Sequence, residues 1–143
     1  MAGAERPGPE KKARIREFGE VFTPPHIVSQ MCDMLEAENP EADVFAPETT
    51  FLEPTCGDGA FVLEILRRKF DRCEKRADFT AALRSVYGME LQADNVAACI
   101  ENVTALCRER FEPTRAELEI INDHIIQADA LKVMKMMRDE ALR

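Results

Sequence analysis

The chain has 143 residues, of which 45% are hydrophobic, so it can bury the core of a single domain. No apolar run reaches membrane-spanning length and the charged N-terminus lacks the apolar centre of a signal peptide, so we expect a cytoplasmic protein without a membrane contact. The net charge of −8 opposes a large nucleic-acid footprint built from this chain alone, because neutralising phosphates requires many lysines and arginines.

The first segment, residues 1–16, combines Pro, Gly and charged residues without a periodic pattern. This composition predicts a flexible basic tail in front of a single domain over residues 17–143. The basic residues of the tail are interpreted as solvated, with a nucleic-acid-binding arm as the alternative.

A helix is predicted after Thr23, which is a good N-cap residue, with Pro24 at the first helical position. Asn39–Pro40 ends this helix, and residues 40–48 form a connector. The Thr23 hydroxyl and the amides near it are suited to an anion such as a carboxylate. The apolar face of the helix is expected to comprise Ile27, Val28, Met31, Met34 and Leu35.

Residues 49–61 read TTFLEPTCGDGAF and predict a strand, a glycine turn and a helix. The strand covers Thr50–Glu53, and Gly57 and Gly59 are spaced to let the backbone pass close to a ligand. This order is typical of a nucleotide-type cofactor site at the carboxyl end of a parallel strand, and a tight turn without a ligand is the alternative. The helix that follows would bury Phe61, Val62, Ile65, Leu66 and Phe70.

Acidic residues in the glycine turn narrow the choice of ligand. Glu53 and Asp58 would repel a diphosphate, but they suit a ligand that carries an ammonium group. Val62 stands where a third glycine of the dinucleotide pattern would be. A nicotinamide-dependent dehydrogenase is therefore disfavoured.

Two further strands are predicted, and each ends at or near an acid. After a charged, solvated turn over residues 71–78, residues 85–90 form a strand that ends on Glu90. An acid at this position often binds a ribose hydroxyl pair, and an exposed or helix-capping glutamate is the alternative. Residues 124–129 form the third strand, which ends on Asp129.

Helices are expected between and after these strands. A helix over residues 93–111 is predicted to bury a stripe that includes Cys107, and residues 117–121 form at most a short element before a turn at Asn122–Asp123. Residues 131–143 are Met-rich and helical. The alternation of strands and helices predicts an α/β fold, half of a doubly wound sheet with right-handed crossovers.

Cysteine and histidine are too scattered to indicate disulfides or a metal site. The number of cysteines is odd, no C-x-x-C pair occurs and there are only two histidines. We therefore expect no metal, and reduced thiols that pack as small core residues. The cysteines are Cys32, Cys56, Cys73, Cys99 and Cys107.

Four segments, in this order, resemble motifs of the S-adenosylmethionine-dependent DNA adenine-N6 methyltransferases of restriction–modification systems. They are GEVFTPP, FLEPTCGDGAF, YGMEL and IIQADAL, and the resemblance covers Phe18 to Leu131. Each motif alone is loose, but the ordered set with Thr-Pro ahead of the glycine turn is specific. The resemblance implies a partial Rossmann-like methyltransferase fold, with an N-terminal helix and about three parallel strands with flanking helices.

The resemblance also implies a cofactor, S-adenosylmethionine, and a role for each matching residue. Thr23 would meet the methionine carboxylate, and Glu53 would hold the ammonium. Glu90 would accept from both ribose hydroxyls, and Asp129 from the adenine amino group. The implied cofactor-binding residues are Phe22, Thr23, Glu53, Cys56, Gly57, Asp58, Gly59, Glu90, Leu91, Asp129 and Ala130.

The chain departs from the family at the catalytic motif, Asn (or Asp)-Pro-Pro followed by an aromatic residue. Fourteen residues follow Asp129 and none forms that motif, so we assign no catalytic residue. We expect the cofactor-binding portion of such an enzyme, inactive alone, with DNA reached only through missing regions or a partner subunit. The alternatives are a stand-alone S-adenosylmethionine-binding or partner-docking module and a methyltransferase for an RNA or protein acceptor.

The expected strand order 3-2-1-4-5 has a consequence for this chain. Without a fourth strand, the strand at Thr50–Glu53 would lie at an open edge of the sheet. We expect either self-association through this edge or a C-terminal helix folded against it.

Overall fold

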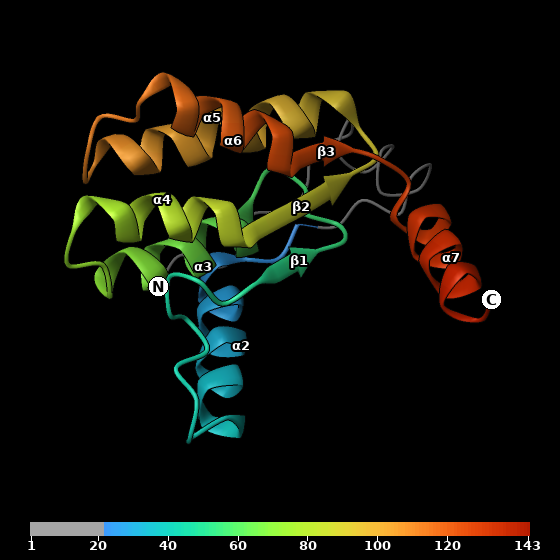
Figure 1. The fold of residues 1–143 in the computed structure, drawn as a ribbon, viewed down its shortest axis with the longest axis horizontal. Helices are drawn as coiled ribbons and strands as arrows, with labels where there is room; N and C mark the ends of the chain where they lie inside the picture. Colours follow the sequence, from blue (N-terminus) through green and yellow to red (C-terminus); the bar gives the residue numbers. More distant parts are fainter. Residues whose placement is uncertain (1–21) are drawn as a thin grey trace.

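The computed structural model describes residues 22–143, and the predicted basic tail lies outside them. The described residues form an α/β structure with one three-stranded parallel sheet of order β1-β2-β3. Figure 1 shows the strands side by side, pointing toward the side on which the C-terminal helix lies. The elements are α2 (Pro25–Glu38), β1 (Phe51–Glu53), α3 (Ala60–Asp71), α4 (Arg76–Ser85), β2 (Val86–Glu90), α5 (Ala93–Arg108), α6 (Arg115–His124), β3 (Ile125–Gln127) and α7 (Ala130–Ala141).

The parallel register confirms the predicted order of the three strands. Phe51 pairs with Val86 between β1 and β2, and Gly88 pairs with Ile125 between β2 and β3. Within residues 22–143, β1 is paired on one side only, so it lies at an edge of the sheet, as expected. One face of the sheet packs into the core with α3 and α5, whose buried side chains include Val62, Ile65, Leu66, Phe70, Cys99, Val103, Leu106 and Cys107.

The cysteine prediction agrees with the structure. All five cysteines are free, and only Cys73 is not fully buried. Cys99 and Cys107 lie on the buried side of α5, which ends at Arg108, three residues earlier than predicted. Burial raises the pKa of the Cys107 thiol to about 12, so this thiol is a neutral core group.

The predicted beginning of α2 is wrong by one residue, and its predicted buried face is confirmed at Val28 but wrong at Met31, Met34 and Leu35. Pro24 occupies the N-cap position and Pro25 the first helical position, and no side chain caps this end. The buried residues are Val28 and Cys32, whereas Met31 and Met34, which belonged to the predicted face, are exposed.

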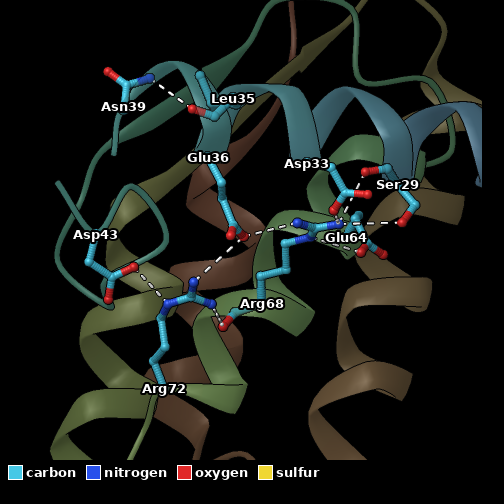
Figure 2. Close-up of polar contacts among 9 residues, drawn as sticks. All are labelled: Ser29, Asp33, Leu35, Glu36, Asn39, Asp43, Glu64, Arg68 and Arg72. Carbon is cyan, nitrogen blue, oxygen red and sulfur yellow. Dashed lines mark hydrogen bonds and ion pairs between the residues drawn. The ribbon is translucent and has the colours of Figure 1, made fainter. Parts of the chain in front are cut away.

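A cluster of ion pairs explains which side of α2 faces α3 (Figure 2). The Arg68 guanidinium on α3 lies 2.8 Å from the Asp33 carboxylate and 2.9 Å from that of Glu36, both on α2. Arg68 also donates to the Ser29 carbonyl at 3.1 Å, and Arg72 pairs with Asp43 of the connector at 2.7 Å. These contacts turn the polar side of α2 toward α3, and the methionines are left in solvent.

Two helices were not predicted in their observed form. The segment over residues 71–78 is not one solvated turn, because α4 begins at Arg76. The helix α6 runs through Asn122 and Asp123, where a turn was expected. Both helices lead directly into strands, so β2 and β3 begin at Val86 and Ile125, one residue later than predicted.

The last helix, α7, has no buried residue. Figure 1 shows it standing off the sheet beyond the ends of the strands. The expectation that the C-terminal helix folds against the open edge is therefore wrong for this structure. Among the helices of residues 22–143, none has the length and apolar character needed to cross a membrane.

Candidate functional site

Three of the four predicted acids follow the ends of three neighbouring strands, and the fourth, Asp58, lies in the glycine turn. Glu53 is the last residue of β1, Glu90 is the last residue of β2, and Asp129 lies two residues beyond β3. Because the strands are parallel and adjacent, their carboxyl ends lie along one edge of the sheet (Figure 1). The fold therefore brings to one edge residues that are up to 76 positions apart in the sequence.

The glycine turn is held against this edge by backbone and side-chain hydrogen bonds. The Cys56 amide donates to the Met89 carbonyl of β2 at 2.8 Å, which ties the turn to the neighbouring strand. The Asn102 side-chain amide on α5 donates to the Asp58 carbonyl at 3.0 Å. Asn102 was not singled out from the sequence, since a polar residue on a helix carries no signal of this long-range contact.

Both glycines of the turn have positive φ angles, +55° at Gly57 and +109° at Gly59. A Cβ atom on Gly57 would come within 2.9 Å of the Phe22 ring, and one on Gly59 within 3.0 Å of the Cys99 sulfur. The turn therefore needs these glycines for its own conformation and packing, a reason that the sequence did not reveal.

The contact of Phe22 with Gly57 brings the segment in front of α2 to the glycine turn. Phe22 and Thr23 line a cavity of about 90 Å³ together with residues of the turn. This agrees with the predicted grouping, although Phe22 and Gly57 are 35 positions apart. The cavity is lined by Phe22, Thr23, Glu53, Thr55, Cys56, Gly57, Asp58, Ala60 and Phe61.

Two larger cavities occur in the described part of the chain, one adjoining this region and one away from it. One of about 490 Å³ shares Phe22, Thr23 and Asp58 with the small cavity and extends between α2 and α3. The other, of about 500 Å³, lies between the start of β1 and α4, where Thr50 and Arg84 line it. This second cavity lies at the start of β1, whereas the three acids lie at the carboxyl ends of the strands. We therefore assign the candidate site to the carboxyl edge of the sheet.

Each of the three acids at the strand ends already accepts a hydrogen bond through one carboxylate oxygen. The Glu53 Oε1 atom accepts from the Thr55 amide at 3.2 Å, and the Glu90 Oε2 atom from the Gln92 amide at 2.5 Å. The Asp129 Oδ1 atom accepts from the Lys132 amide at 3.3 Å and so caps α7. These bonds fix the orientation of the acids, and they give Asp129 a structural role that the sequence analysis did not assign.

The remaining predicted residues differ in their accessibility. Leu91 is exposed directly after β2, and Gln127 of β3 donates to its carbonyl at 3.2 Å. Ala130 is the first residue of α7 and is half-buried. Cys56 is buried, and a hydrogen bond with the Cys99 thiol together with burial raises its pKa, so this thiol is neutral.

No cation-binding cluster accompanies these acids. Within residues 22–143, no group of three or more His, Cys, Asp or Glu side chains has an arrangement that could hold a metal ion. The lining of the small cavity combines hydrogen-bond acceptors, the glycine turn and the Phe22 ring, which together suit an organic ligand with hydrogen-bond donors.

Comparison with known proteins gives no relative from which a role could be transferred. No protein-family model, no curated protein and no solved structure matches the chain.

Proposed function

We propose that this chain is the S-adenosylmethionine-binding portion of a DNA adenine-N6 methyltransferase with a Rossmann-like fold. The observation that carries the proposal is the contact between Phe22 and Gly57, together with the cavity that Thr23 and Glu53 both line. Phe22 and Thr23 belong to the motif GEVFTPP, and Glu53 and Gly57 belong to FLEPTCGDGAF. The proposal requires these two motifs to meet, because both would contact the methionine end of the cofactor.

The acceptor groups at the edge fit the donors of S-adenosylmethionine. Glu53 and Asp58, which line the small cavity with Thr23, suit the ammonium of the methionine part. Glu90, at the end of the adjacent strand, would accept from the ribose hydroxyls, and Asp129, beyond the third strand, from the adenine amino group. When bound, this cofactor supplies an electrophilic methyl group.

The geometry disfavours a dinucleotide in the same place. Asp58 lies in the turn where a pyrophosphate would be bound, and its charge would repel one. The contact of Asn102 with the Asp58 carbonyl holds this residue in the turn. A ligand that carries positive charge at this end is therefore the better match.

Calorimetry with the cofactor tests the proposal. We expect the chain to bind S-adenosylmethionine and its demethylated product weakly, and Glu90→Ala to weaken this binding about tenfold or more, because two charge-assisted hydrogen bonds to the ribose are lost. Glu101→Ala, which removes an exposed acid on α5, is the matched control and should bind as the wild type does. Equal affinity of the wild type and Glu90→Ala would remove Glu90 from the site.

A second prediction concerns the reaction itself. We expect no methyl transfer to duplex DNA by this 143-residue chain alone, because no residue of it forms the motif that would hold the adenine amino group for in-line attack. A tritium-transfer assay with a preparation free of host methyltransferase measures this. Incorporation above the no-enzyme control would contradict the prediction, and incorporation into RNA or protein but not DNA would favour another acceptor.

A further inference from the structure

The helix α2 buries few of its side chains, so apolar contact alone does not explain its position. Of its 14 residues only Val28 and Cys32 are buried, and Met31 and Met34 are exposed. The stabilisation that burial provides scales with the apolar area removed from water, and this area is small for α2. Polar contacts therefore contribute a large part of what holds the helix in place.

The Arg68 guanidinium supplies these contacts, and Figure 2 shows it pointing from α3 toward α2. Besides its ion pairs with Asp33 and Glu36, it donates to the carbonyl and to the hydroxyl oxygen of Ser29, at 3.1 and 3.3 Å. These three residues of α2 are spaced at four and three positions, so they lie on one side of the helix. One arginine, whose side chain is 15% exposed, therefore contacts this side over two helical turns.

The guanidinium is itself fixed relative to the sheet. It lies over the ring of Phe45, with 5.3 Å between its central carbon and the ring centroid. Phe45 is fully buried and stacks on Phe51 of β1, with 5.5 Å between the ring centroids. On α3 the Arg68 Nε atom also donates to the Glu64 carboxylate at 3.1 Å. Arg68 thus fixes α2 relative to β1, the strand that leads into the glycine turn.

The start of α2 carries two residues of the candidate site. Phe22 and Thr23 directly precede Pro24, the N-cap, and Pro25, the first helical residue. A proline fixes its own φ angle and restricts the residue before it, so this short segment is a stiff extension of the helix. The position of α2 therefore determines whether the Phe22 ring lies on Gly57 and whether Thr23 lines the small cavity.

The charge of Arg68 also keeps three carboxylates together. They belong to Asp33, Glu36 and Glu64. Two other arginines reach these acids only at longer distances, 3.6 Å from Arg72 to Glu36 and 3.7 Å from Arg67 to Glu64. A single exposed ion pair contributes little, but here one cation is shared by acids on both helices. Without it, the acids of α2 would face Glu64 of α3 with like charge, which opposes the docking of α2.

We propose that Arg68 is a positioning residue for the candidate site, which holds α2 against α3 so that Phe22 and Thr23 meet the glycine turn. Arg68 acts through α2 and is assigned no contact with the ligand. The inference deepens the proposed function and rests on it for the ligand, S-adenosylmethionine. The placement of Phe22 itself can be measured without any ligand.

A tryptophan at position 22 reports this placement, because the chain contains no other tryptophan. In the Phe22→Trp background we expect Arg68→Met to shift the emission to longer wavelength and to increase quenching by acrylamide, because the indole leaves the turn. Methionine keeps an apolar stem and removes the charge. Arg108→Met removes an exposed arginine of α5 that pairs with Glu112 at 3.3 Å, and this matched control should leave the emission unchanged. Circular dichroism verifies that each variant is folded.

Hydrogen exchange gives the same information in a chain that keeps Phe22. A helix of 14 residues is marginal in water when it is not docked, so the amides of α2 should exchange faster in Arg68→Met than in the wild type. The amides of β2 should keep their protection, since this strand lies in the centre of the sheet. Unchanged exchange in α2, or an unchanged emission of the tryptophan, would overturn the positioning role.

Calorimetry with S-adenosylmethionine connects the placement to the site. Arg68→Met should weaken binding about tenfold, and Arg68→Lys should restore part of the affinity, because an ammonium keeps the charge but lacks the planar fork. Arg108→Met should bind as the wild type does. Equal affinity of the wild type and Arg68→Met would overturn the role of Arg68 at the site. A wild type that does not bind S-adenosylmethionine would contradict the proposed function instead, and the emission and exchange measurements would then decide the placement.

Discussion

Glu117→Ala is expected to lower the free energy of unfolding by about 2–4 kcal/mol, because it removes a buried carboxylate that three donors share. Glu117 on α6 is 2% exposed. Its carboxylate accepts from the Thr80 hydroxyl of α4 at 2.9 Å, from the Thr114 amide at 2.8 Å and from the Arg76 guanidinium. The substitution leaves these donors without their acceptor and loosens the junction of α4 with α6.

A glutamate on the same helix supplies the control. Glu119 is largely exposed and pairs with Arg115 at 3.6 Å, so Glu119→Ala should change the free energy of unfolding by no more than about 0.5 kcal/mol. Urea denaturation of both variants measures the difference. Equal stability of the two would show that the Glu117 network adds nothing to the fold.

The pKa of Glu117 predicts how this difference depends on pH. Burial acts to raise the pKa, but hydrogen bonds from Thr114 and Thr80 and the charge of Arg76 outweigh it, so the folded pKa lies below its ordinary value. The stabilisation is therefore complete above the unfolded pKa of about 4.3 and is lost as the pH falls through the lower folded pKa. The gap in stability between wild type and Glu117→Ala should shrink in this acidic range and stay constant near neutrality.

Local patterns predicted the parts of the fold that local interactions determine. The glycine turn, the helix after it and the three strands are each encoded by neighbouring residues, and all form within a few residues of the predicted positions. The alignment of Glu53, Glu90 and Asp129 along one edge of the sheet follows from these elements, because the carboxyl ends of adjacent parallel strands lie together. The meeting of Phe22 with Gly57 was predicted only through the resemblance, because no local rule links segments so far apart.

Two helices were missed for different reasons. The helix α6 has a capping box in its sequence, since Thr114 and Glu117 have the spacing that satisfies both amides, and this pattern indicates a helix start at Arg115. The helix α4 has no such signal, because its N-cap is Lys75. Its start is stabilised instead by the Asp78 carboxylate, which accepts from the amides of Glu74 and Lys75 at 2.9 and 3.1 Å.

Long-range polar contacts account for the remaining errors. Apolar periodicity assigned Met31 and Met34 to the buried face of α2, but Arg68 forms its ion pairs with Asp33 and Glu36 on the other side (Figure 2). Such a network depends on an arginine more than thirty residues away, and no window along the sequence contains it. The same limit applies to Lys69, which is fully buried although its type predicts an exposed side chain.

Lys69→Met is expected to lower the free energy of unfolding by about 2–3 kcal/mol, because three partly buried carbonyls lose the donor that they share. The Lys69 Nζ atom lies 2.6 Å from the Ala46 carbonyl oxygen, 3.2 Å from that of Pro47 and 2.5 Å from that of Thr49. This one ammonium fixes the connector that leads into β1. Methionine fills a similar volume, so the loss reports on the hydrogen bonds more than on packing.

The dependence of this effect on pH separates the buried ammonium from a generic packing defect. Burial lowers the pKa of Lys69 to about 8, whereas an unfolded lysine titrates near about 10.4. Between these values the unfolded chain binds more protons, so wild-type stability should rise with pH across this window, and Lys69→Met should lack this rise. The gap in unfolding free energy is therefore expected to be wider at pH 10 than at pH 7, with the exposed Arg67→Met on the same helix as the control. A gap that stays constant or narrows would show that the Lys69 ammonium is not destabilised by burial.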